Sequence, residues 1–142
     1  MDDRYRLDGK VAVVTGCASG VGESVAKLFT ERGSKVLAVD VNADGLECAM
    51  EGIENVATLA QDVTDSDAAE KIIDAALQKF GQVDILINNA GINRDNLSLR
   101  MKDEEWQKVI DINLTSTFLL SKYAIKKMMK GNAGRVINIT SI

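Results

Sequence analysis

Three glycines near the N-terminus have the spacing of a turn that binds phosphate. Gly16, Gly20 and Gly22 follow a short apolar run, Val11 to Val14, and precede apolar residues at helical spacing. A strand, a glycine turn and a helix in that order present main-chain N–H groups at the positive end of the helix dipole. Such groups attract a diphosphate, so the pattern predicts that a dinucleotide binds here.

Each glycine has its own task in a turn of this kind. Gly16 permits the tight bend, Gly20 lets the backbone approach the ligand, and Gly22 lets the helix pack closely on the strand. The first two glycines are separated by three residues, whereas the general dinucleotide fingerprint has one residue there. The glycines by themselves therefore leave a purely structural turn open.

An acidic residue at the end of the next apolar segment favours a nucleotide ligand. Residues 35–40 have the pattern of a second strand, which ends at Asp40. Asp40 follows Gly22 at close to the roughly 20-residue spacing at which an acid meets the ribose hydroxyls of NAD. A lone aspartate at a strand end is usually a solvated turn residue. Together with the glycine turn, it favours a bound dinucleotide.

Composition excludes several other kinds of site. The chain has 142 residues and no histidine, which excludes Ser-His-Asp and Cys-His catalysis and most zinc sites, so we expect no metal. Cys17 and Cys48 lack a CxxC partner, and we expect no structural disulfide. The net charge of -4 argues against a broad surface for nucleic acid or an anionic membrane. No apolar segment is long enough to span a membrane, and we expect a cytoplasmic protein.

The elements that must position these residues alternate between strands and helices. Helical patterns include a helix that begins near Thr64 and a long helix over residues 103–130. Apolar runs predict strands at residues 11–14, 35–40, 56–60, 83–87 and 135–140. This alternation predicts one α/β domain over residues 1–142, a doubly wound, Rossmann-like parallel sheet with strand order 3-2-1-4-5.

That strand order brings the residues with chemical potential to one crevice. The crossover direction reverses beside the first strand, so the carboxyl ends of strands 1 to 4 open toward the same place. The residues expected at these ends are Gly16, Asp40, Asp62 and Asn89. Ser141, at the end of the fifth strand, should face the crevice too. We therefore expect one shared ligand site.

In this order and spacing, the motifs resemble those of the short-chain dehydrogenase/reductase family along the whole chain. The phosphate turn TGxxxGxG corresponds to residues 15–22, and the NNAG turn corresponds to residues 88–91. The resemblance implies Asn113 and Ser141 as catalytic residues. It implies the following cofactor-binding residues: Gly16, Ser19, Gly20, Val21, Gly22, Asp40, Val41, Asp62, Val63, Asn89, Ala90 and Gly91.

The resemblance implies hydride transfer between a nicotinamide dinucleotide and a carbonyl or alcohol carbon. In the family a tyrosine exchanges the proton, and a lysine four residues later lowers the pKa of that tyrosine. The serine hydrogen-bonds the substrate oxygen, and the asparagine helps to order a relay water. No Tyr-x-x-x-Lys follows Ser141. Tyr123 and Lys127 have this spacing but lie on the long helix before the fifth strand, and we interpret them as surface residues.

We therefore expect the chain to be the first part of such an oxidoreductase, without the C-terminal strands of the full fold, and inactive by itself. The alternative is a non-catalytic dinucleotide-binding or assembly module. A flavodoxin-like FMN protein is a weaker alternative, because Asp40 and the NNAG turn would then have no role. The fifth strand would lie at an open sheet edge, and the long helix would expose apolar residues such as Trp106 and Phe118, so we expect a homo-oligomer.

The choice of cofactor depends on the charge beside the adenosine ribose. The segments Arg94-Asp95-Asn96 and 100–106 resemble the 3-oxoacyl-acyl-carrier-protein reductases of the family, which usually take NADPH. The carboxylate of Asp40 would repel the added phosphate of NADPH, and Ser19 stands where NADP-preferring relatives often have a basic residue. We therefore predict NAD(H), with a small carbonyl or alcohol compound, such as a 3-oxoacyl thioester, as substrate.

Overall fold

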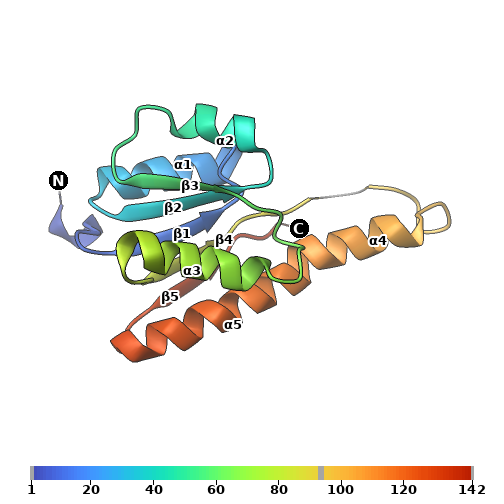
Figure 1. Ribbon diagram of the computed structural model, residues 1–142. Coiled ribbons are helices and arrows are strands. Elements are labelled where there is room, and N and C mark those ends of the chain that lie inside the picture. The colour runs from blue at the N-terminus through green and yellow to red at the C-terminus, as the bar shows by residue number, and fades with distance from the viewer. Residues whose placement is uncertain (1, 93–94, 142) are drawn as a thin grey trace.

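The apolar runs of the sequence form the strands of one parallel sheet (Figure 1). The computed structural model describes residues 2–92 and 95–141. The strands are β1 (Val11–Thr15), β2 (Lys35–Asp40), β3 (Val56–Ala60), β4 (Ile85–Asn88) and β5 (Arg135–Asn138). They lie in the order β3-β2-β1-β4-β5, and each neighbouring pair is parallel. The predicted doubly wound topology is confirmed.

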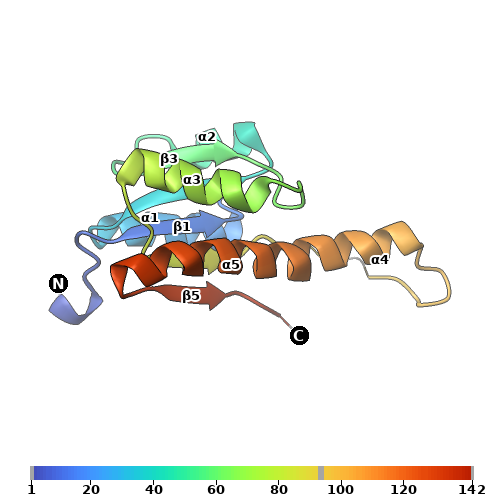
Figure 2. The ribbon, with the colours of Figure 1, turned by 60° about the horizontal axis from the view of Figure 1, so that its bottom comes forward.

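Helices cover both faces of the sheet (Figure 2). One face carries α1 (Gly20–Glu31) and α2 (Ala43–Met50), and the other carries α3 (Ala68–Phe80) and α5 (Ser116–Met128). The remaining helix, α4 (Asp103–Ile110), precedes α5 and projects beyond the sheet in both ribbon views. No helix in the described parts of the chain is long and apolar enough to cross a membrane.

Strands β1 and β2 are buried on both sides, which explains their continuously apolar sequences. Successive side chains of a strand point to opposite faces. Val13 and Leu37 pack with α3 and α5, whereas Val14 and Ala38 pack with α1 and α2. All four side chains are fully buried. This double burial fixes the strand ends from which the candidate site is built.

Two helices end at glycines, and one helix begins later than the sequence pattern predicts. Gly81 caps α3 with a φ of +82°, and Gly33, with a φ of +94°, follows the end of α1. The predicted start of α3 near Thr64 is wrong, because the helix begins at Ala68. Asp67 is the N-cap residue of the observed helix, and the Thr64 hydroxyl donates to the Asp62 carboxylate at 2.7 Å.

The chain is helical over the whole of the predicted residues 103–130, but the hydrogen-bond pattern changes within it. A π-helical segment (Asp111–Thr115) separates α4 from α5, and a 3-10 turn (Met129–Gly131) follows α5. A π-helical turn holds an extra residue and often marks a functional position. Asn113, a candidate catalytic residue, lies within this segment.

The strands on the far side of β1 are shorter than the sequence pattern predicts. β4 begins at Ile85 rather than at residue 83, and β5 ends at Asn138 rather than at residue 140. Only Val136 of β5 is half-buried, and the other residues of the strand are exposed. The apolar pattern of residues 135–140 therefore overestimates how far the edge strand is paired.

Candidate functional site

The glycine turn joins β1 to α1 at the carboxyl edge of the sheet. Gly16 has a φ of +73° and Gly20 a φ of +61°, conformations that strain any other residue. A side chain at Gly22 would collide with the Gly16 carbonyl group, so only glycine allows this close packing of helix and strand. A side chain at Gly20 would meet no atom within 4 Å. Backbone with open space beside it, at the start of a helix, fits a diphosphate group.

The remaining residues of the turn leave its outer side accessible. Ser19 is the N-cap residue of α1, and its side chain makes no capping hydrogen bond. Val21, in the first turn of the helix, is 54% exposed. Both side chains therefore lie at the surface where a ligand bound to the turn would pass.

Thr15 connects the glycine turn to the NNAG turn. Its buried hydroxyl oxygen accepts hydrogen bonds from the main-chain N–H groups of Asn89, at 3.0 Å, and Ala90, at 2.9 Å. The side-chain amide of Asn89 donates to the Thr15 carbonyl oxygen at 3.1 Å. These bonds hold the carboxyl ends of β1 and β4 together.

The carboxylate of Asp40 lies against the glycine turn. Its Oδ2 accepts a hydrogen bond from the main-chain N–H of Ala18 at 2.9 Å, and its Oδ1 accepts one from that of Asn42 at 2.9 Å. Val41, the next residue, is largely exposed. A negative group is therefore held beside the turn, at the end of β2.

Cys17 lies in the turn but is a structural residue. Its side chain is fully buried, and its thiol donates to the Val14 carbonyl oxygen. Burial, with an added contribution from the charge of Asp40, raises the pKa of the Cys17 thiol to about 12. The thiol therefore stays protonated and is a poor nucleophile. Among the described residues, no cluster of cysteine, aspartate or glutamate side chains could hold a metal ion.

Asp62 and Val63 follow β3 at the same edge of the sheet. Oδ1 of Asp62 accepts hydrogen bonds from the Thr64 main-chain N–H at 2.9 Å and from the Thr64 hydroxyl at 2.7 Å. These bonds hold the pKa of Asp62 below its ordinary value of 3.8. The Gln61 N–H donates to the Asp40 carbonyl oxygen at 3.0 Å, which places Asp62 beside the end of β2. Val63 packs against the core.

Asn113 directs its side-chain amide at the chain that follows the NNAG turn. Its Oδ1 accepts a hydrogen bond from the Ile92 N–H at 2.9 Å, and its Nδ2 donates to the Ile92 carbonyl oxygen at 2.7 Å. A side chain at Gly91 would approach Asn113 Oδ1 to 3.0 Å, so Gly91 leaves room for this pair of bonds. The amide of Asn113 therefore positions the loop after the NNAG turn.

Ser141 lies three residues beyond the end of β5. Asn138, the last residue of β5, pairs with Asn88, the last residue of β4. The Ile139 N–H then donates to the Asn88 carbonyl oxygen at 2.9 Å. The segment that carries Ser141 therefore leaves the sheet beside the NNAG turn, on the edge that holds the other candidate residues.

Comparison with known proteins decides the family. The family model described as short chain dehydrogenase matches residues 10–142. The chain belongs to the short chain dehydrogenase family. It is 44% identical to the 3-oxoacyl-acyl-carrier-protein reductase FabG of Vibrio cholerae and 43% identical to that of Escherichia coli K12, each over 137 residues. A solved structure from Sinorhizobium meliloti 1021, assigned to the short-chain alcohol dehydrogenases, superposes with a TM-score of 0.92 at 32% identity.

These matches cover nearly all of this family member but only part of each relative. All three cover 96% of the chain and 56% of the matched protein. The chain thus spans about half the length of the relatives it matches. The segment that resembles the 3-oxoacyl reductases is described in part: Arg94 lies outside the described residues, and residues 100–106 lead into α4.

The two tyrosines of this chain lie away from the candidate crevice. Tyr5 ends a short 3-10 helix (Asp3–Tyr5) at the N-terminus. Tyr123 is half-buried on α5, where it packs against the hydrophobic core. The ten-residue separation from Asn113 corresponds to about 15 Å along a helix. Tyr123 therefore belongs to the packing of α5 against the core.

Two residues that organise the site are not among the predicted site residues, although Thr15 begins the phosphate-turn motif. The hydroxyl of Thr15 organises the NNAG turn, and a polar residue closing a buried apolar strand is a usable signal, because buried hydroxyl groups need partners. Ile92 is held by Asn113 through its main chain alone. Main-chain bonding of this kind leaves no signature in side-chain type, so the sequence could not reveal it.

Proposed function

We propose that this chain binds a nicotinamide dinucleotide at the carboxyl edge of its sheet and functions in an oxidoreductase. The observation that supports this best is the glycine turn, where Gly20 offers open backbone at the start of α1 and Asp40 is bonded to the same turn through Ala18. The bound cofactor supplies or accepts a hydride. Membership of the short chain dehydrogenase family supports a carbonyl or alcohol compound as its reaction partner.

The residues of the chain have distinct tasks in this proposal. Main-chain N–H groups at the start of α1 bind the diphosphate, and the carboxylate of Asp40 accepts hydrogen bonds from the adenosine ribose. Asp62 borders the adenine, and residues 89–91 lie between the two ends of the cofactor. The hydroxyl of Ser141 donates a hydrogen bond to the substrate oxygen, while Asn113 keeps the loop after residue 91 in place.

We propose NAD(H) as the preferred cofactor. Two main-chain bonds hold the carboxylate of Asp40 where the ribose hydroxyls of NAD would donate to it. A phosphate on that ribose would be repelled by the carboxylate. Among the described residues, no lysine or arginine forms an ion pair with Asp40 that would offset the repulsion.

The relatives suggest a class of substrate. The Vibrio cholerae and Escherichia coli relatives are, by name, reductases of 3-oxoacyl groups carried on acyl-carrier protein, and we propose a 3-oxoacyl thioester as substrate. We further propose that the 142-residue chain by itself turns this substrate over slowly, because its tyrosines lie away from the crevice. General acid–base help is worth about 10² to 10⁴ in rate. A cytoplasmic location belongs to the proposal, supported by two free cysteines.

Fluorescence titration with NADH and NADPH tests the binding proposal. We expect NADH to bind more tightly than NADPH. Ser19→Glu places a carboxylate beside the diphosphate without removing a capping bond, and we expect it to weaken both dinucleotides at least about tenfold. Leu99→Glu adds the same charge at an exposed residue before α4 and should leave both affinities unchanged.

Two results would contradict the proposal. Absence of binding by either dinucleotide, or equal losses in Ser19→Glu and Leu99→Glu, would exclude the glycine turn as the site. Tighter binding of NADPH would exclude the role given to Asp40. A turnover assay on an acetoacetyl thioester is the companion measurement. Fast turnover would show that the proton reaches the substrate without a tyrosine at this crevice, whereas binding without turnover agrees with a dinucleotide-binding module.

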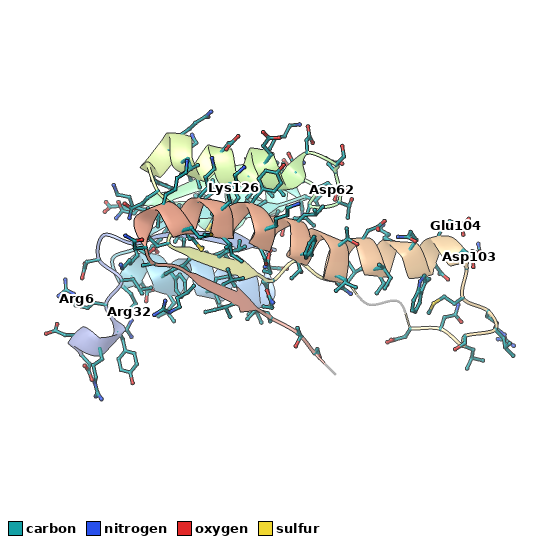
Figure 3. All side chains as sticks on the ribbon, turned by 90° about the horizontal axis from the view of Figure 1, so that it is seen from below. Arg6, Arg32, Asp62, Asp103, Glu104 and Lys126 are labelled. Carbon is teal, nitrogen blue, oxygen red and sulfur yellow. The ribbon has the colours of Figure 1, made fainter. Side chains whose placement is uncertain are left out.

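We also propose that the chain self-associates through α4 and α5. Exposed apolar residues of α4, α5 and the short segment that follows each of them form a stripe along the long helix: Trp106, Leu114, Phe118, Ile125 and Met129. Figure 3 shows Asp103 and Glu104 at the free tip of α4 and Lys126 toward the other end of the long helix. An antiparallel pair about a two-fold axis would place each acidic end beside a basic end.

Light scattering coupled to size exclusion tests this association. We expect a dimer or larger species that dissociates in Phe118→Glu, which puts a charge at the middle of the stripe. Leu99→Glu, which adds the same charge outside the stripe, should keep the assembly. A monodisperse monomer of the unsubstituted chain at high concentration would overturn the proposal.

A further inference from the structure

Strand β5 has little side-chain packing to set its register. It pairs with β4 over four residues, from Ile85 opposite Arg135 to Asn88 opposite Asn138, and only Val136 in it is half-buried. Register is strongly specified where one face of a strand is buried and weakly specified where it is not. Something other than apolar burial must therefore fix where β5 stops.

A buried amide stands at the end of this pairing. Asn88 is 5% exposed, and its Nδ2 donates to Asn138 Oδ1 at 3.0 Å and to Ser121 Oγ, on α5, at 3.1 Å. Its Oδ1 is buried with no hydrogen-bond partner among the described residues. Burying a carbonyl oxygen in this way is unfavourable, and an apolar pair of similar shape would be about as stable. Stability alone does not explain this amide.

We propose that the hydrogen-bonded amides of Asn88 and Asn138 fix the register of β5 against β4. They thereby fix the position of Ser141 relative to β4 and α5. A slip of two residues keeps every side chain on its own face. The apolar side chain that opposes the slip is Val136, which is half-buried against the core and would be replaced there by Gly134 or Asn138. The slip would bring Val136 or Thr140 opposite Asn88. Val136 offers no acceptor, and the Thr140 oxygen lies one bond nearer its own main chain than the Asn138 oxygen does. The amide pair therefore disfavours both slips.

The consequence for the site follows from strand geometry. A two-residue slip moves the chain about 7 Å along the strand direction, which exceeds the reach of a hydrogen bond. Asn88 is thus a positioning residue for Ser141, and this part of the inference rests on the proposed function. Asn89, its neighbour, is bonded to β1, so adjacent asparagines connect the glycine turn on one side and β5 on the other.

The test replaces both amides by apolar side chains. In the double variant Asn88→Val, Asn138→Val we expect the melting temperature to stay within about 4 °C of that of the unsubstituted chain. We expect the register to become heterogeneous. In NMR spectra the amide signals of Ile139 to Ser141 should split, and the Overhauser contact between the residue 88 α-proton and the Ile139 amide proton should weaken. Asn138→Asp keeps the acceptor and should show one set of signals.

Thr58→Val is the matched control, because it removes a hydroxyl bond to Glu47 at the opposite edge of the sheet. One set of signals with the contact to Ile139 intact in the double valine variant would overturn the proposal, and so would splitting in Thr58→Val. If the double variant does not fold, Asn138→Val and Asn138→Asp at this exposed position give the same comparison. NADH titration of these variants separates the two proposals, because loss of register should leave binding at the glycine turn unchanged.

Discussion

The two halves of the sheet are built differently. In the first half, every residue of β1 is buried, β2 is buried along most of its length, and β3 at the edge is half-buried. In the second half β4 is buried throughout, whereas β5 at the edge has one half-buried residue and exposes Ile137. The first half carries the glycine turn and Asp40, and the second carries Ser141 and the π-helical segment with Asn113. The strands of the first half are therefore held by packed apolar layers out to the half-buried edge strand β3. In the second half only β4 is held in this way, and the end of β5 is bonded to it by amide hydrogen bonds.

The amide bonds of the second half are few and specific. Asn113 holds the Ile92 peptide through two bonds, and Asn88 holds Asn138 and Ser121. Because each such bond contributes only about 1 kcal/mol to stability, their effect is on geometry. Substitutions in the first half should therefore change stability and cofactor binding, and those in the second half should mainly change position.

The largest expected effect comes from truncating one apolar side chain in each half. Leu37→Ala empties a fully buried site in β2 and should lower the free energy of unfolding by about 3 kcal/mol. Ile137→Ala, in β5, removes a side chain that is 46% exposed and should cost less than about 1 kcal/mol. Urea unfolding followed by circular dichroism measures both. Equal losses would mean that β5 is packed as tightly as β2 in solution.

A methyl group added to a glycine in each half should have the next largest effect. Gly22→Ala forces a carbon against the Gly16 carbonyl and the Asn89 amide, and we expect a loss of about 2 kcal/mol in urea unfolding. Gly131→Ala, after α5, meets no atom within 4 Å and should change stability by no more than about 0.5 kcal/mol. A neutral Gly22→Ala would contradict the close packing of α1 on β1.

Removing one carboxylate in each half tests where the charge acts. Asp40→Asn should move the ratio of NADPH to NADH affinity toward NADPH by about tenfold, or about 1.4 kcal/mol, because repulsion of the ribose phosphate is lost. Asp103→Asn makes the same change of charge at the tip of α4 and should leave the ratio unchanged (Figure 3). Fluorescence titration gives both ratios, and an unchanged ratio in Asp40→Asn would count against the assigned cofactor.

The smallest expected effect concerns acid titration at the end of β3. The pKa of Asp62 is lowered by bonds from Thr64, so their stabilisation is present above the ordinary value of 3.8 and is lost as the pH falls through the lowered value. Thr64→Val removes the hydroxyl bond and should raise the pKa of Asp62 toward 3.8. The stability change should be a few tenths of a kcal/mol, because solvent screens this site.

NMR titration of the Asp62 carboxyl carbon provides the measurement. Thr117→Val, in α5, removes a hydroxyl bond to a main-chain carbonyl group and should leave the Asp62 titration unchanged. An unshifted Asp62 titration in Thr64→Val would show that the main-chain N–H bond alone determines the pKa.

The strand order and the strand ends at Gly16 and Asp40 could be predicted because their causes are local and periodic. Apolar runs, glycines with left-handed φ and strand-to-helix alternation are all written in residue types. The predicted start of α3 was wrong. The Thr64 side chain could have capped a helix or bonded to Asp62, and only the folded loop decides which of these it does. The end of β5 was wrong because an edge strand is paired only as far as its neighbour extends.

The sequence by itself determined the sheet order and the residues at one edge of the sheet, because both depend on side-chain type at regular spacing. Its motifs indicated the family through their resemblance to known members. Tertiary structure alone decided how those residues are held. In the folded chain the Asp40 carboxylate accepts a hydrogen bond from the glycine turn. The Asn113 side chain is bonded to the main chain of Ile92, and the Asn88 side chain is bonded to that of Asn138. These are contacts between segments far apart along the chain, and their geometry follows from how the layers pack rather than from any local pattern.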